Sequence, residues 1–193
     1  IISTILAVAL GLFLYLSRKE GLYPKPLAYA IASTIIDFLR STPFIILMLL
    51  LVPITRFIIG TAIGTNAVII ALIVSGVPYM ARLVENSFLE IDQEVIEAAQ
   101  SLGVTTKDLI FHFLLPEAAS ILIANLTIAA VGTIGSTAVA GPIGGGGLGD
   151  LAIQFGYSRF DYQTMFLAVA ILIVIVQVVQ RLGVFLARKA KRL

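Results

Sequence analysis

The stretch IDQEVIEAAQSLGVTTKDLIFHFLLPEA, residues 91–118, is the one long polar passage in an otherwise apolar chain. Asp92 stands where its side chain can cap a short helix. After it, apolar residues recur at intervals of three and four, which predicts one apolar stripe along that helix. The stripe comprises Val95, Ala98 or Ala99, and Leu102. Gly103 then predicts the end of the helix, because glycine adopts the left-handed conformation of a helix terminus without steric cost.

A second helix is expected after this turn. Thr105 and Asp108 have the spacing of a loose capping box, with Asp where Glu or Gln is usual. Pro116 lacks a backbone donor and clashes with the preceding turn, so the second helix should end or kink just before the next apolar run. The stretch therefore predicts a helix–turn–helix with Gly103 and Pro116 as its hinges.

Glu97, Ala98 and Ala99 fall in the middle of the first helix, where two small side chains let another protein surface approach the backbone. With Gly103 and Leu115-Pro116 further on, they resemble the cytoplasmic coupling loop of ABC-importer membrane subunits. Phe113 stands where that pattern usually has isoleucine, which keeps an apolar anchor. The resemblance implies a coupling loop at about residues 85–116 that docks on an ATPase subunit. The docking residues would be Glu97, Ala98, Ala99, Leu102 and Gly103. A plain amphipathic hairpin between two membrane spans is the alternative.

The composition indicates an integral membrane protein. Hydrophobic residues make up 59% of the chain and charged residues 12%, against about 45–50% and 25% in soluble domains. Cysteine is absent, which excludes disulfides and thiolate metal sites. The basic residues are spread over short loops, so no nucleic-acid partner is expected. Residue 1 lies inside an apolar run, so we expect residues 1–193 to be one domain with a truncated N-terminus.

Five membrane spans are predicted, since a bilayer core needs about 20 mostly apolar residues per helix. They are the end of a first span at residues 1–17, then 41–55, 67–83, a run that begins at 118, and 162–180. A charge at the bilayer centre is costly. We therefore place Arg40 at the cytoplasmic interface, with residues 27–39 as an amphipathic approach and Asp37 as a pairing partner. An intramembrane Arg40 that touches substrate is the alternative.

Two further features concern helix packing. Ser75, Gly76 and Pro78 interrupt the third predicted span, which favours close packing over a kink that faces a pathway. The fourth span is rich in small residues, which lets it approach its neighbours or a second copy of the chain.

The distribution of basic residues predicts the orientation. With the C-terminus inside, the outer segments hold two basic residues, Arg56 and Arg159, and the inner segments hold eleven. The eleven are Arg18, Lys19, Lys25, Arg40, Arg82, Lys107, Arg181, Arg188, Lys189, Lys191 and Arg192. This bias satisfies the positive-inside rule. It predicts a coupling loop and a C-terminus in the cytoplasm, and the resemblance implies that the spans lie in the inner membrane of a bacterium.

Other motifs in the sequence are typical of different functions. Gly144, Gly146 and Gly149 match the dinucleotide fingerprint, but a soluble βαβ unit is missing around them. Asp150, in the sequence Gly-Leu-Gly-Asp, offers an intramembrane aspartyl protease as a distant alternative. That chemistry needs two carboxylates that share one site, and Asp161 is expected in the same external loop. His112 is the lone histidine, so no metal site is predicted.

The resemblance covers essentially the whole chain, and within the family it is greatest to methionine-importer permeases. It is carried by FLRSTPFIIL from Phe38, PYMARLVENSFLEI from Pro78 and GPIGGGGLGDLAIQFGY from Gly141. It implies an all-α, non-catalytic permease that carries D- or L-methionine and holds no cofactor of its own. The implied partners are a second permease copy, two ATPase subunits that use ATP, an external solute-binding protein and the lipid bilayer. Another amino acid or an osmolyte is the alternative substrate, and a channel or secondary transporter is the alternative class.

Overall fold

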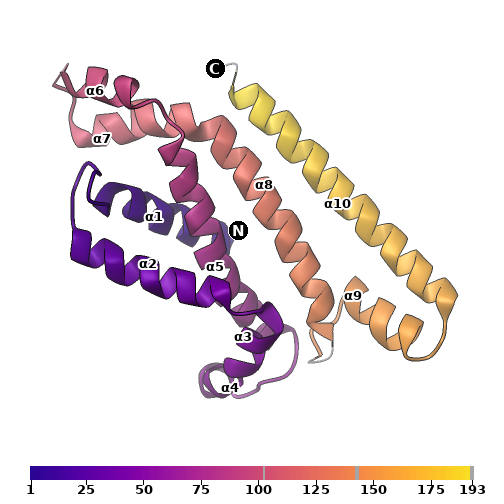
Figure 1. Ribbon diagram of the computed structural model, residues 1–193. Helices are drawn as coiled ribbons and strands as arrows, with labels where there is room; N and C mark the ends of the chain where they lie inside the picture. The colour runs from indigo at the N-terminus through magenta and orange to yellow at the C-terminus, as the bar shows by residue number, and fades with distance from the viewer. Residues whose placement is uncertain (102, 142–143, 192–193) are drawn as a thin grey trace.

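The structure, a computed structural model, describes residues 1–101, 103–141 and 144–191 (Figure 1). These ranges contain helices and no strand, so the predicted all-α fold is confirmed. The helices are α1 Ile2–Ser17, α2 Pro26–Ser41, α3 Phe44–Leu50, α4 Val52–Ile59, α5 Thr65–Leu89, α6 Gln93–Ser101, α7 Thr106–Asp108, the π-helical turn η1 Leu109–Leu114, α8 Leu115–Val139, α9 Leu148–Asp150, the π-helical turn η3 Leu151–Tyr157 and α10 Tyr162–Ala190.

α5 is the central helix of the fold. It packs against α1, α2 and α8, and α8 packs in turn against α10. Small residues make two of these contacts close. A Cβ at Gly11 in α1 would lie 2.6 Å from the Ala81 carbonyl oxygen of α5, and one at Gly183 in α10 would lie 2.0 Å from Thr127 Oγ1 of α8. The predicted close packing of the fourth span is confirmed at Ala129, which is buried in one cluster with Ala81 of α5, but Gly132 and Gly135 of that span meet no neighbour within 4 Å.

Three described helices are long and apolar enough to cross a membrane: α5, the continuous helix Thr106–Val139 and α10. α2 and α3 together pass the same test but are bent by 108°, and α1 is a shorter apolar helix. The chain is thus a multi-span membrane protein. Its total of five spans stays a prediction.

The second predicted span, residues 41–55, is wrong as a continuous helix. The chain breaks after Ser41, restarts at Phe44 and breaks again at Leu51. Both restarts carry proline, since Pro43 is the N-cap residue of α3 and Pro53 lies in the first turn of α4. Proline cannot donate to the preceding turn, so it belongs at helix starts. The apolar run is instead shared by two short helices that cap one end of α5.

A short helical segment lies where an external loop was expected. The glycine-rich stretch supplies turns with positive φ at Gly144, Gly146 and Gly147, and the chain then forms α9 and η3. This segment packs against the start of α10 (Figure 1). A Cβ at Gly149 would lie 2.2 Å from Ala138 Cα, so glycine is required for the close approach of α9 to α8.

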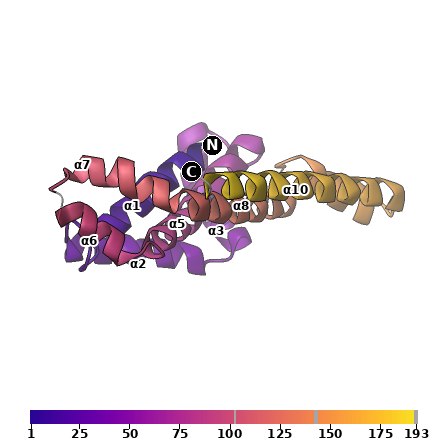
Figure 2. The ribbon, with the colours of Figure 1, turned by 90° about the horizontal axis from the view of Figure 1, so that it is seen from above.

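The two ends of the molecule differ in what they carry. α6, α7 and the C-terminus lie at one end, while α4 and α9 lie at the opposite end (Figure 1). Seen from above, α8 and α10 overlap and extend to one side, and α1, α2 and α6 lie at the other (Figure 2). The sequence also predicts that the coupling loop and the C-terminus share one side of the membrane, which agrees with this arrangement.

Candidate functional site

The coupling loop folds as the helix–turn–helix that its capping residues predict. The backbone N–H of Glu94 donates to Asp92 Oδ1 at 3.0 Å, at the start of α6. Gly103 has φ +71°, the left-handed conformation expected at the end of that helix. The backbone N–H of Asp108 then donates to Thr105 Oγ1 at 3.3 Å, and Thr105 is the N-cap of α7. The local predictions for Asp92, Gly103 and Thr105 are confirmed.

The inward face of α6 matches the predicted stripe at Ala99 and differs from it at Val95. Ile96 and Ala99 are buried, whereas Val95 is 38% exposed. The buried pair is spaced by three residues, and Val95 lies one position off that stripe. Glu97 and Ala98 are exposed, as is Gly103. Leu102 lies outside the described residues.

A hydrophobic cluster fastens the coupling loop to the membrane helices. Ile96 and Ala99 of α6 belong to it, together with residues of α1, α5, η1 and α8. Within it the Tyr15 and Phe88 rings lie 5.4 Å apart between centroids. Its buried members are Tyr15, Val84, Phe88, Ile91, Ile96, Ala99, Leu109, Leu114, Ala118 and Leu122. Because these side chains are packed like a domain core, α6 is held rigidly on the end of α5.

Of the two outcomes expected at Pro116, a helix end or a kink, the helix end is wrong. The helix runs without a break from Thr106 to Val139, and Pro116 lies in its first α-helical turn after η1. A proline ring crowds the carbonyl four residues earlier and removes one hydrogen bond. The wider π-helical turn directly before it accommodates both effects. α5 also extends to Leu89, so the first residues of the predicted loop, 85–89, are membrane-helix residues.

A cavity of about 350 Å³ lies between the end of α2, the start of α3, the middle of α5 and the second half of α8. Its lining residues are Leu39, Arg40, Thr42, Phe44, Leu72, Ser75, Gly76, Tyr79, Gly132, Thr133 and Ser136. Nothing lies within 4 Å of a Cβ built on Gly76 or Gly132, so these glycines open onto space and not onto a packed neighbour. Sequence reasoning favoured packing at Ser75 and Gly76 and missed the cavity.

Arg40 lies in the wall of this cavity, beside the middle of α5, whereas the sequence placed it at the cytoplasmic interface. The bend between α2 and α3 carries the end of α2 against the central helix. A charge at this depth is tolerated when it faces a cavity and pairs with another charge. Arg40 Nη1 lies 3.5 Å from Asp37 Oδ1, so the predicted Asp37–Arg40 pair is confirmed. The predicted inner segments still hold most of the basic residues when Arg40 is left out of the count.

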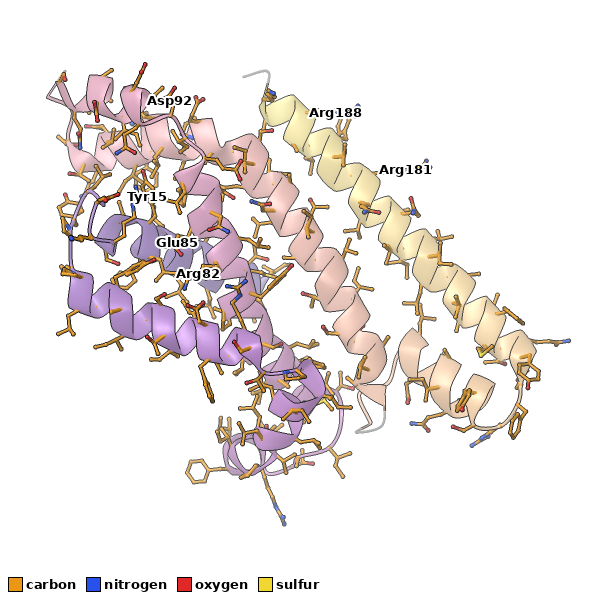
Figure 3. All side chains as sticks on the ribbon, viewed as in Figure 1. Tyr15, Arg82, Glu85, Asp92, Arg181 and Arg188 are labelled. Atoms are coloured by element: carbon orange, nitrogen blue, oxygen red, sulfur yellow. The ribbon has the colours of Figure 1, made fainter. Side chains whose placement is uncertain are left out.

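A charged network joins α2 to α5 next to the cavity. Arg82 donates to Asp37 Oδ2 at 2.8 Å and to Glu85 Oε2 at 2.7 Å. Its side chain is 15% exposed and that of Glu85 is 2% exposed. The Arg82 guanidinium also donates to Ser33 Oγ at 2.5 Å. Figure 3 shows Arg82 and Glu85 on the part of α5 that faces α1 and α2.

The other singled-out polar residues take structural hydrogen bonds. Gln154 Nε2 donates to Asp150 Oδ1 at 2.5 Å within the α9–η3 segment. Asp161 is the N-cap of α10 and accepts from the Thr164 hydroxyl at 2.6 Å and from its backbone N–H at 3.2 Å. These bonds from Thr164, the hydroxyl first, hold the pKa of Asp161 below its usual value. Asp150 and Asp161 are thus each held by a different residue, Gln154 for the first and Thr164 for the second.

His112 is exposed and lies 3.5 Å from Asp108, one helical turn earlier. An exposed pair at this spacing is a minor surface contact. It adds nothing to the cavity or to the exposed face of α6.

Two features of the described residues bear on function: a cavity with polar lining residues among apolar helices, and an exposed helical loop at one end of the molecule. Such a distribution fits a membrane permease, which lets a solute pass and receives its driving force from elsewhere. Residues 7–192 match the family model of binding-protein-dependent transport system inner membrane components, and the chain belongs to this family. It is therefore a multi-pass protein of the inner membrane and the permease component of an ABC transporter.

Relatives and solved structures agree with this membership. The chain is 42% identical over 185 residues to the probable D-methionine transport system permease protein MetI of Vibrio cholerae. The aligned residues make up 95% of this chain and 82% of that protein. It is 41% identical over 170 residues to the methionine import system permease protein MetP of Bacillus subtilis, covering 88% and 77%. A structure of the inward-facing MetNI methionine ABC transporter matches with a TM-score of 0.92 and 34% identity, over 98% of this chain and 89% of that one.

Proposed function

We propose that this chain is the translocating subunit of an ATP-driven importer for methionine, as the D form, the L form or both. The relatives that carry the words D-methionine or methionine in their names are similar to it along most of their length. The coupling loop supplies the observation that carries the proposal. It is an exposed helix–turn–helix fixed by a packed core to α5, whose midpoint borders the cavity.

The proposed assembly holds two copies of this chain, two ATPase subunits and an external solute-binding protein. Docking falls to the exposed residues Glu97, Ala98 and Gly103, since the Ala99 side chain is buried in its own chain. Closure of the ATPase pair would push on α6 and tilt α5 between inward- and outward-facing states. The chain itself is proposed to need no cofactor, because ATP is hydrolysed by the partner. The coupling loop and the C-terminus are proposed to face the cytoplasm.

The test uses the complete complex in proteoliposomes, with ATP-dependent uptake of labelled methionine as the readout. Gly103 offers a matched pair of variants, Gly103→Asn and Gly103→Asp. Asn and Asp have nearly the same shape and both tolerate positive φ, and nothing lies within 4 Å of a Cβ at this position. A charge buried without a partner in a docking interface is costly. We therefore expect Gly103→Asp to lower uptake at least about tenfold and Gly103→Asn to stay within about twofold of the wild type.

Each result has a separate meaning. Equal uptake by both variants and the wild type contradicts docking at Gly103. An equal loss in both variants shows that backbone strain, not docking, is the cause. If the wild-type complex carries another amino acid or an osmolyte and ignores methionine, the substrate is wrong while the permease role stands. Uptake without ATP contradicts the importer itself.

A further inference from the structure

We propose that Arg40 is a binding residue for the carboxylate of the solute, in a site formed by the cavity between α2, α3, α5 and α8. The inference rests on the proposed function and deepens it, since it names the class of group that the permease itself recognises. The ligand class is a zwitterionic amino acid with an apolar side chain. The argument uses the position of Arg40, its charge partners and the two kinds of side chain around it.

The cavity has the size and position of a solute site. Its volume of about 350 Å³ lies at the lower end of the range of about 300–1,000 Å³ for small-molecule pockets. It borders the middle of α5, Ser75 to Tyr79 in a helix that runs from Thr65 to Leu89. Small residues on α5 and α8, Gly76 and Gly132, keep that space open. A solute that crosses between the two ends of the molecule can therefore be held here halfway.

Arg40 has binding capacity that its own chain does not use fully. Its neighbour Asp37 is taken by Arg82, which donates to the two carboxylate oxygens at 2.8 and 2.9 Å. Arg40 reaches the same carboxylate at 3.5 Å and is 34% exposed on its side chain. A guanidinium carries five N–H donors in a fork that fits a carboxylate through two parallel bonds. Its remaining donors are thus available to an acceptor that enters the cavity.

The rest of the lining matches the other parts of such a ligand. Thr42, Ser75 and Thr133 line the wall that Arg40 shares. Their hydroxyls donate to carbonyls of the preceding turn, so towards a ligand they offer acceptor oxygens, which suit an ammonium group. Leu39, Phe44 and Leu72 supply an apolar portion. A pocket with a few placed polar groups and an otherwise apolar lining fixes the orientation of a small ligand. An arginine among membrane helices is costly, and a functional role accounts for that cost.

The test measures binding by the permease–ATPase complex in nanodiscs, without the solute-binding protein. Labelled L-methionine is displaced by unlabelled L-methionine or by L-methioninol, in which a CH₂OH group replaces the carboxylate. We expect L-methioninol to need at least about a tenfold higher concentration, because charge-assisted bonds to Arg40 are lost. Arg40→Ala should weaken L-methionine binding by a similar factor, and Arg40→Lys should restore part of it because the charge remains. Arg56→Ala, on exposed α4, is the control and should bind as the wild type does.

The outcomes separate this site from the proposed function. Equal displacement by L-methioninol and L-methionine overturns the carboxylate site. This comparison uses the wild-type complex alone, so it does not depend on whether a variant folds. Wild-type affinity in Arg40→Ala overturns it as well, as does an absence of displaceable binding in a complex that transports methionine. In each of these cases methionine uptake by the wild-type complex still stands. Failure of that uptake refutes the proposed function first.

Discussion

At the scale of single residues, Glu85 shows how charge is retained among apolar helices. It is 2% exposed and lies 2.7 Å from Arg82, which also binds Asp37 on α2. A buried ion pair contributes little net stability compared with apolar residues, but removing one partner leaves the other charge uncompensated. Within this network the Arg82–Asp37 bond links α5 to α2, and Glu85 supplies the buried countercharge of Arg82 on α5 itself.

We expect Glu85→Ala to destabilise the protein by about 3 kcal/mol, which corresponds to roughly 6–12 °C in Tm. Thermal unfolding of the purified protein in detergent measures this shift. Glu90→Ala provides the control, because Glu90 follows the same helix but is exposed, and surface changes stay within about 0.5 kcal/mol. Equal Tm values for the two variants would contradict the network as described.

The residues that sequence reasoning placed correctly are those whose role is local. Asp92, Gly103 and Thr105 act on neighbouring backbone groups, so their identity alone indicates what they do. The cavity beside Arg40 was not predicted, because it depends on how the bend between α2 and α3 brings the end of α2 near α5. Pro43 marks the break locally, but the direction of the bend involves contacts between segments far apart in the chain. Val95 and Ile96 are adjacent apolar residues on different faces of α6, and the sequence does not say which of the two is buried.

At the scale of helices, the contact of α10 with α8 depends on one glycine. A Cβ at Gly183 would lie 2.0 Å from Thr127 Oγ1 and 2.6 Å from Thr127 Cβ. Gly183→Val should force the two helices apart or the Thr127 side chain out of its rotamer. Overpacking of this kind costs about 1–3 kcal/mol.

Thermal unfolding of Gly183→Val in detergent tests this contact, and a lower Tm is expected. Ala170→Val is the matched control, since Ala170 lies on the exposed surface of the same helix and receives the same side chain. Should the control lose as much stability as Gly183→Val, the loss reflects the β-branched residue in a helix and not the contact.

The long helices α8 and α10 were predicted well, as were the short capped helices α6 and α7, whereas the α9–η3 segment was not. α8 and α10 follow from uncharged runs that far exceed the length of an isolated turn. The α9–η3 segment was missed because four successive glycines and nearby charges indicate a loop, while its helix is stabilised by packing on α10. Pro116 predicted a break, yet a π-helical turn removes the clash. Neither tertiary packing nor such a turn leaves a periodic signal in the sequence.

At the scale of the whole molecule, the arrangement of its ends predicts chemical accessibility. The chain has no cysteine, so single cysteines report position without background. Lys107→Cys in α7 and Lys189→Cys in α10 should react with a membrane-impermeant maleimide from the cytoplasmic side. Arg56→Cys in α4 should react from the other side, and all three positions are exposed. Labelling of right-side-out and inverted vesicles measures this.

The labelling pattern distinguishes an error in the arrangement of the helices from an error in their orientation across the membrane. If Lys107→Cys and Lys189→Cys react from different sides, the shared end of α7 and the C-terminus is contradicted. If both react from outside and Arg56→Cys reacts from inside, the fold stands and the orientation drawn from the basic residues is wrong. The unsubstituted chain must remain unlabelled in both preparations.

The proline inside α5 makes one part of this helix easier to bend than the rest. α5 has 25 residues and is about 37 Å long at about 1.5 Å per residue. Pro78 lies within the stretch of α5 that lines the cavity, next to Tyr79, and it removes one hydrogen bond and crowds the Val74 carbonyl. The helix is therefore most compliant beside Gly76. A force applied at Leu89 is then expected to bend α5 near Pro78. The part of α5 that lines the cavity would change its orientation, while the end at Thr65 would keep its position.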